Sequence, residues 1–174
     1  MGRDLLTGKV AIVTGGGRGI GEGISQRLAQ EGAKVVISEI DPETGKKVAS
    51  DLRNKGHEAI AIQIDVSKSE DVSRLVEETL SQFGNIDILV NNAGVHKRTP
   101  FLDIPEKEWD WIMSVDLKGP FLCSQRVARE FVKTKRKGKI VNIASIAAEV
   151  AIANQAHYSA AKAGVFMLTR AIAL

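Results

Sequence analysis

Cysteine is nearly absent from this 174-residue sequence: Cys123 is the only one, so no disulfide can form within the chain. No apolar run approaches the ~20 residues that cross a bilayer, and no apolar signal-peptide stretch follows Met1. A strong excess of charge is also lacking, because 24 basic and 21 acidic residues leave a net charge of +3. We therefore expect a cytoplasmic protein with no nucleic-acid or membrane partner and no metal site.

Five short apolar runs alternate with stretches of helical periodicity, and no low-complexity linker interrupts them. The runs are rich in Val and Ile, which suits strands covered on both faces. They cover residues 10–13, 35–37, 59–62, 86–90 and 140–143. The helical stretches cover residues 20–30, 42–54, 69–83 and 107–134 and end near Gly32, Gly56, Gly84 and Gly138. A last helical stretch begins at Tyr158. Residues 1–174 therefore predict a single α/β domain, a Rossmann-like doubly wound parallel sheet with ligands at the carboxyl ends of its strands.

The segment between the first strand and the first helix reads Thr14-Gly-Gly-Gly-Arg-Gly-Ile-Gly21. Glycines let the backbone approach a diphosphate, and the amides at a helix N-terminus favour negative charge. The spacing matches neither the Gly-x-Gly-x-x-Gly pattern nor a Walker loop. We predict a dinucleotide-binding loop rather than a flexible turn, with contacts from Gly15, Gly17, Arg18, Gly19, Ile20 and Gly21.

Glu39 ends the second strand, 24 residues after Gly15. A carboxylate there can accept hydrogen bonds from an adenosine ribose and repel a 2′-phosphate, which favours NAD over NADP. Arg18 leaves NADP open, because it can reach a 2′-phosphate; it can equally be a solvated cation or a partner for Glu39. Asp41 is a second carboxylate, which we assign to helix capping because Pro42 follows it.

Five motifs together resemble the short-chain dehydrogenases/reductases over essentially the whole chain. They are the Thr14–Gly21 loop, Asp65-Val66, Asn91-Asn-Ala-Gly94, Ser145 and Tyr158-Ser-Ala-Ala-Lys162. The resemblance implies a strand order of 3-2-1-4-5 in this chain, with two further strands after it. It also implies a nicotinamide-dependent oxidoreductase that interconverts a secondary alcohol and a ketone.

The expected catalytic residues are Ser145, Tyr158, Lys162 and Asp116. Tyr158 and Lys162 are spaced i, i+4, so they share a helix face, where an ammonium favours the phenolate and makes the tyrosine a usable acid and base. The resemblance implies that Lys162 also holds the nicotinamide ribose. Ser145 follows the fifth strand and resembles the hydroxyl that stabilises the substrate oxygen, although a turn serine is the alternative.

The remaining expected cofactor contacts come from the resemblance. It implies that Asp65 and Val66 meet the adenine ring, with helix-entry capping as another role for Asp65. It also implies that Asn92, Ala93 and Gly94 pass close to the cofactor riboses.

Asp116 departs from the family, which usually has Asn within a Val-Asn-Leu-Lys-Gly segment. The resemblance implies that the backbone carbonyl here holds a water that leads to the lysine, so catalysis can survive the change. An ionised Asp116 near Lys162 would favour the charged lysine.

Two further groups each have two interpretations. His96, Lys97 and Arg98 are interpreted as a solvated loop, or else as a face for an anionic substrate. One of Trp109 and Trp111 is expected in the core, or else the two edge a substrate cleft or an interface together with Ile112 and Val115.

The expected function is alcohol and ketone interconversion with NAD preferred, on a 3-oxoacyl thioester or a sugar or polyol. The alternative is a non-catalytic nucleotide-binding or interaction protein on the same scaffold. A homodimer or homotetramer is expected from the resemblance, with Ala160, Val165 and Leu168 at the contact. The last helical pattern stops in Ala-Ile-Ala-Leu without a cap, which predicts about 70–80 further residues after Leu174.

Overall fold

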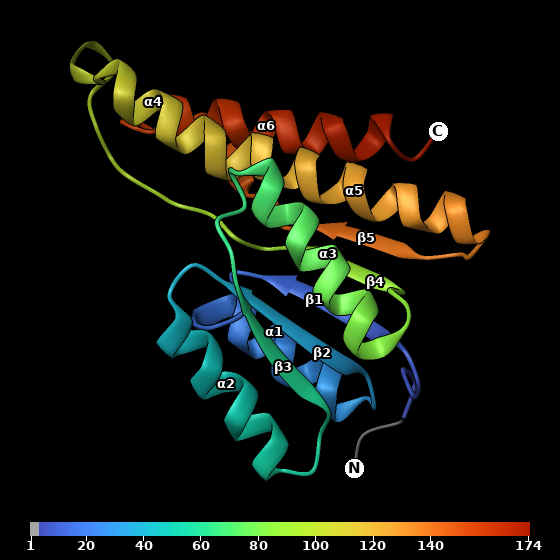
Figure 1. The fold of residues 1–174 in the computed structure, drawn as a ribbon. Helices are drawn as coiled ribbons and strands as arrows, with labels where there is room; N and C mark the ends of the chain where they lie inside the picture. The colour runs from blue at the N-terminus through green and yellow to red at the C-terminus, as the bar shows by residue number, and fades with distance from the viewer. Residues whose placement is uncertain (1–3) are drawn as a thin grey trace.

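The computed structural model describes residues 4–174 and contains one parallel five-stranded sheet (Figure 1). Its strands are β1 (Val10–Thr14), β2 (Lys34–Glu39), β3 (Ala59–Gln63), β4 (Ile88–Asn91) and β5 (Lys139–Asn142). They lie in the order β3-β2-β1-β4-β5. The predicted Rossmann-like fold and strand order are therefore confirmed.

Helices connect the strands close to the predicted positions. They are α1 (Gly19–Gln30), α2 (Pro42–Asn54), α3 (Ser69–Phe83), α4 (Glu106–Met113), α5 (Gly119–Thr134) and α6 (Ala156–Ala171). A π-helical turn at Ser114–Lys118 joins α4 to α5, so the stretch predicted as one helix is continuous but locally widened. Short 3-10 turns lie at Phe101–Asp103 and Ile146–Ala148. In residues 4–174 no helix is both long enough and apolar enough to cross a bilayer.

Alternate residues of the strands pack on opposite faces of the sheet. In β1, Ala11 and Val13 belong to the core shared with α1 and α2, whereas Ile12 belongs to the core shared with α3 and α5. All three side chains are completely buried. Covering both faces explains why the strands are runs of Val and Ile without polar alternation. In Figure 1, α6 lies alongside the α4–α5 helix.

The end of α5 differs from the prediction. Gly84 ends α3 in the left-handed conformation as expected, with its amide donating to Leu80 O at 2.8 Å. In α5 that conformation falls on Lys135, with φ of 52°, well before Gly138. A Cβ on Gly138 would lie 2.1 Å from the Phe131 ring, so this glycine makes room for a packed aromatic side chain and does not end the helix.

The order of the strands creates the crevice for a ligand. The chain moves from β1 outward through β2 to β3, then crosses over to β4 and β5 on the other side of β1. Loops after β1 and β4 therefore leave in opposite directions at the carboxyl edge, which is where ligands bind in open α/β sheets.

Candidate active site

The loop after β1 is held by the segment after β4. Asn92 Nδ2 donates to the carbonyl oxygens of Thr14 and Gly15, both at 3.0 Å. Thr14 Oγ1 accepts from the amides of Asn92 and Ala93 at 3.0 and 3.1 Å. The ends of the neighbouring strands β1 and β4 thus hold the glycine loop through hydrogen bonds between side chains and backbone.

Gly17 and Gly21 of this loop have no room for a side chain. A Cβ on Gly21 would lie 2.0 Å from Gly15 O, because the first turn of α1 packs directly on the loop backbone. A Cβ on Gly17 would lie 2.9 Å from both Glu39 Cγ and Thr44 Oγ1. The loop is therefore a compact cradle at a helix N-terminus, the arrangement that suits the diphosphate of a dinucleotide.

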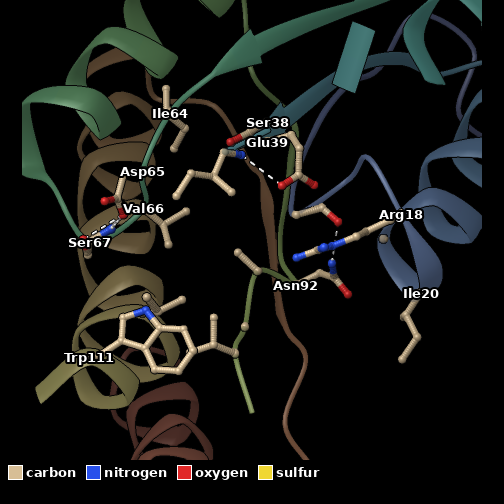
Figure 2. Close-up of a pocket in the computed structure, with 17 residues that line it drawn as sticks. Arg18, Ile20, Ser38, Glu39, Ile64, Asp65, Val66, Ser67, Asn92 and Trp111 are labelled. Atoms are coloured by element: carbon tan, nitrogen blue, oxygen red, sulfur yellow. Dashed lines mark hydrogen bonds between the residues drawn. The ribbon is translucent and has the colours of Figure 1, made fainter. Parts of the chain in front are cut away.

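A cavity of about 450 Å³ opens beside the cradle (Figure 2). Most of the predicted cofactor-binding residues line it: Gly15, Arg18, Ile20, Gly21, Glu39, Asp65, Val66, Asn92, Ala93 and Gly94. Gly17, Gly19, Tyr158 and Lys162 do not line it. Gly17 instead packs against Glu39, and Lys162 Nζ lies beneath Gly94 of the lining. The loop, β2, β3 and β4 thus contribute to one cavity that extends from the cradle, which is the shape a dinucleotide needs.

Glu39 is buried at the wall of this cavity. Its Oε2 accepts from the Gly17 amide at 3.0 Å and its Oε1 from the Ile40 amide at 2.9 Å. Figure 2 shows the Arg18 guanidinium directed into the same cavity. Asp41 lies outside the cavity lining and caps α2, accepting from the Glu43 amide at 3.0 Å, as predicted.

The far end of the cavity lies between β3 and the α4–α5 helix. Asp65 Oδ1 accepts from the Ser67 amide and hydroxyl at 2.9 and 2.7 Å, so this carboxylate closes the turn after β3. It does not cap α3, whose N-cap residue is Lys68, and that alternative is wrong. Trp111 lines the same end together with Val115, in line with the alternative that these residues edge a cleft (Figure 2).

The expectation of a tryptophan in the core is wrong. Trp109 and Trp111 are 37% and 45% exposed, because α4 extends past the sheet and has no strand beneath its outer face.

Tyr158 and Lys162 share a face of α6, with Lys162 Nζ 5.6 Å from the centre of the tyrosine ring. The ammonium is almost fully buried, donates to Ile143 O at 3.2 Å and lies 3.2 Å from Asp116 Oδ2. The contact between the Lys162 ammonium and Asp116 Oδ2 is a buried ion pair. The predicted approach of Asp116 and Lys162 is therefore observed.

Asp116 lies in the π-helical turn and is completely buried. Its Oδ1 accepts from the Val95 amide at 2.7 Å. Burial raises the pKa of the Asp116 carboxyl above its usual value, and the Lys162 ammonium and the Val95 amide oppose that rise. A Cβ on Gly94 would lie 3.1 Å from Asp116 Oδ2 and 3.5 Å from Lys162 Nζ, so the lining of the cavity passes directly over this ion pair.

Ser145 lies after β5 at the start of a 3-10 turn. Its Oγ accepts from the Ala147 amide at 3.2 Å, so the side chain does stabilise a turn. A hydroxyl that accepts one bond still has its hydrogen to donate. The turn role and a role toward a substrate oxygen are therefore compatible.

A family model for short chain dehydrogenase matches residues 9–174. The chain belongs to the short-chain dehydrogenase family. A 3-oxoacyl-[acyl-carrier-protein] reductase from Staphylococcus epidermidis is 40% identical over 166 residues, which is 95% of this chain and 68% of that protein. An uncharacterized oxidoreductase from Thermotoga maritima is 41% identical, over 98% of this chain and 66% of its own length. This chain thus spans about two thirds of the length of these curated relatives.

Solved structures of dehydrogenases share the fold. A crystal structure of a short chain dehydrogenase from Mycobacterium smegmatis superposes with a TM-score of 0.96 at 38% identity, and the match covers 98% of this chain and 72% of that one. The strand order and the crevice described above are therefore those of a short-chain dehydrogenase.

We predict that Gly21→Ala weakens dinucleotide binding at least tenfold, about 1.4 kcal/mol, because its Cβ forces the cradle apart. The matched control is Gly23→Ala, in the same helix, whose Cβ meets no atom within 4 Å. Fluorescence titration with NADH on the complete protein measures both dissociation constants. Equal affinities for the two variants would contradict the proposed contact between the cradle and the diphosphate.

We predict that Asp116→Asn becomes more stable relative to the parent as pH rises. Burial raises the folded-state pKa of Asp116 above the ordinary pKa that the carboxyl has in the unfolded chain. The parent therefore has its full stability below that ordinary pKa and loses stability as pH rises through the folded-state pKa. Urea unfolding of both proteins between about pH 4 and pH 7 measures the difference. A difference that stays constant over this range would contradict the raised pKa.

Proposed function

We propose that the protein is a nicotinamide-dependent oxidoreductase that interconverts a secondary alcohol and a ketone. The observation that carries the proposal is the buried Asp116–Lys162 ion pair, which lies under Gly94 at the cavity. Its lysine lies on α6 together with Tyr158. A bound nicotinamide would supply or accept the hydride. The protein residues would bind the cofactor, hold the substrate oxygen and move its proton.

Tyr158 is the proton donor or acceptor in this proposal. A free phenol has a pKa of about 10, which matches neutral pH poorly, and a nearby cation favours the phenolate. Lys162 supplies that cation, fixed by Asp116 and Ile143 O. Tyr158 would donate its hydroxyl proton to the oxygen of a ketone as hydride arrives, and take the proton back from the alcohol in the reverse direction. Ser145 would donate to the same oxygen and stabilise its developing charge.

We propose NAD as the preferred cofactor, with NADP as the alternative. Glu39 supports NAD, since it is buried at the cavity wall and a carboxylate there repels a 2′-phosphate. Arg18 supports the alternative, because it lines the same cavity.

A 3-oxoacyl thioester is the substrate class that we propose. Two relatives support it by their names: the Staphylococcus epidermidis reductase acts on an acyl carrier protein thioester, and a 40% identical dehydrogenase subunit from Thauera aromatica acts on a succinyl-CoA derivative. Steady-state turnover on a panel of 3-oxoacyl thioesters, sugars and polyols tests this choice. The presence of Ser145, Tyr158 and Lys162 together favours an enzyme over a binding protein, which has no need of all three.

We also propose a cytoplasmic homodimer or homotetramer that associates through α5 and α6. An apolar groove of about 550 Å³ lies between these helices and β5, lined by Phe121, Ala128, Val132, Ile140, Leu168 and Ile172. Leu168 is thus available for a contact between subunits. The expectation for Val165 is wrong, because this residue is buried within the protomer at 1% exposure.

We predict that Tyr158→Phe lowers kcat at least a hundredfold while the Kd of the cofactor changes less than threefold, because only the proton-transferring oxygen is removed. Single-turnover hydride transfer and NADH titration on the complete protein measure the two effects. Turnover at even a tenth of the parent rate would remove Tyr158 from this role.

We predict a higher kcat/KM with NAD than with NADP, and a shift of that ratio toward NADP by at least tenfold in Glu39→Ala, about 1.4 kcal/mol. Glu43→Ala is the control, because its carboxylate is exposed on the first turn of α2. An equal or reversed preference in the parent would assign the cofactor choice to Arg18.

We predict a dimeric or tetrameric mass in light scattering at micromolar concentration, and a shift toward monomer in Phe121→Arg, which puts charge into the apolar groove. Leu5→Arg changes an exposed residue outside the groove and should leave the mass unchanged. A monomeric parent protein would contradict the proposed assembly.

A further inference from the structure

Glu108 of α4 is a buried carboxylate that holds three hydrogen-bond donors from two distant segments. Its Oε2 is bound by Lys97 Nζ, and its Oε1 is bound by Thr99 Oγ1 and lies 3.0 Å from His157 Nε2. The three donors lower the pKa of Glu108 to about 2, so the carboxylate is ionised at neutral pH. The Lys97 side chain remains 58% exposed, as expected for a solvated loop, and its ammonium also pairs with Glu108.

His157 connects this carboxylate to the backbone of Tyr158. The ring is completely buried, and the Tyr158 amide donates to its Nδ1 at 2.8 Å. A backbone amide can only donate, so Nδ1 carries the lone pair and the ring proton lies on Nε2. Nε2 then donates to Glu108 Oε1. Glu108 thus selects the tautomer that accepts from Tyr158.

This bond satisfies a free amide at the start of α6. The first amides of a helix have no partner within the helix, and side chains usually supply one. The N-cap residue Gln155 makes no side-chain bond to them. The His157 ring does so for Tyr158, which lies two residues after the first residue of α6.

A second connection reaches Tyr158 from the loop after β4. The His96 ring meets the Tyr158 ring edge to face, with centroids 4.8 Å apart. Lys97 and Thr99, on the same loop, are both bound to Glu108, and the Thr99 amide donates to Asn154 O at 2.9 Å. Glu108 therefore holds Tyr158 both through its backbone and through the residue that packs on its ring.

We propose that Glu108 is a positioning residue for Tyr158, acting through His157 and through the loop that carries His96. The proposal rests on the function proposed above for Tyr158. It assigns Glu108 no contact with substrate or cofactor. Its effect is to hold the phenol where the proton is transferred, which makes kcat more sensitive than cofactor affinity to its loss.

The test compares Glu108→Ala and Glu108→Gln in the complete protein, with Glu106→Ala as control. Glu106 is an exposed carboxylate of the same helix. Glu108→Ala should lower kcat at least tenfold, leave the NADH Kd within threefold, and speed hydrogen exchange at the Tyr158 amide. Glu108→Gln should restore kcat to within threefold of the parent, because an amide oxygen still accepts from His157 Nε2–H. Glu106→Ala should change neither quantity.

His157→Leu keeps the proposal testable if Glu108→Ala does not fold. Leucine has no acceptor for the Tyr158 amide, while Lys97 and Thr99 still donate to Glu108, so the same loss of kcat and the same faster exchange are expected. Parental kcat or unchanged amide exchange in folded Glu108→Ala or His157→Leu would overturn the proposal. So would equal losses of kcat and cofactor affinity, which a merely structural role would give.

Tyr158→Phe separates this inference from the proposed function. If Tyr158→Phe is inactive while Glu108→Ala and His157→Leu turn over normally, the positioning role alone is wrong. If Tyr158→Phe remains active, the proposed function fails and the positioning role fails with it.

Discussion

The site depends on one buried ion pair, between Asp116 and Lys162. Taking two charges out of water is costly, and their attraction compensates only when further hydrogen bonds satisfy both groups. Here Val95 donates to Asp116 and Lys162 donates to Ile143 O. The pair therefore fixes four segments together: the loop after β4, the turn between α4 and α5, the end of β5, and α6. Removing either partner would leave an uncompensated charge in the middle of the site.

The π-helical turn brings Asp116 to that position. Such turns widen a helix by one residue and are frequent at functional sites. Two glycines allow close packing on it: a Cβ on Gly119 would lie 2.9 Å from Val66 Cγ2, and one on Gly164 would lie 2.9 Å from Leu117 Cδ1. Leu117 and Gly119 thus pack the widened turn against α6 on one side and against Val66, at the far end of the cavity, on the other.

Patterns that depend on local chemistry were predictable from the sequence. The bounds of α2 and α3 were predicted correctly because short-range hydrogen bonds mark them. Asp41 caps the start of α2, and Gly84 ends α3. Packing that a residue pattern does not show explains two other outcomes. The Phe131 ring occupies the space beside Gly138, and α4 carries Trp109 and Trp111 past the sheet. Glu108 gave no signal at all: a lone acidic residue on a helix is usually solvated, and its three partners lie 9 to 49 positions away.

The two functional parts of the site come from different parts of the chain and meet at residues 92–95. The cradle, Glu39 and Asp65 belong to β1, β2 and β3, whereas Asp116, Tyr158 and Lys162 belong to the helices after β4. Asn92 holds the cradle with its side chain, and Val95 holds Asp116 with its amide, three residues further along. A shift of this short segment would move the cradle and the Asp116–Lys162 ion pair together. Its hydrogen bonds at both ends keep the distance between the cradle and the ion pair constant, which the proposed hydride and proton transfer to one carbonyl would require.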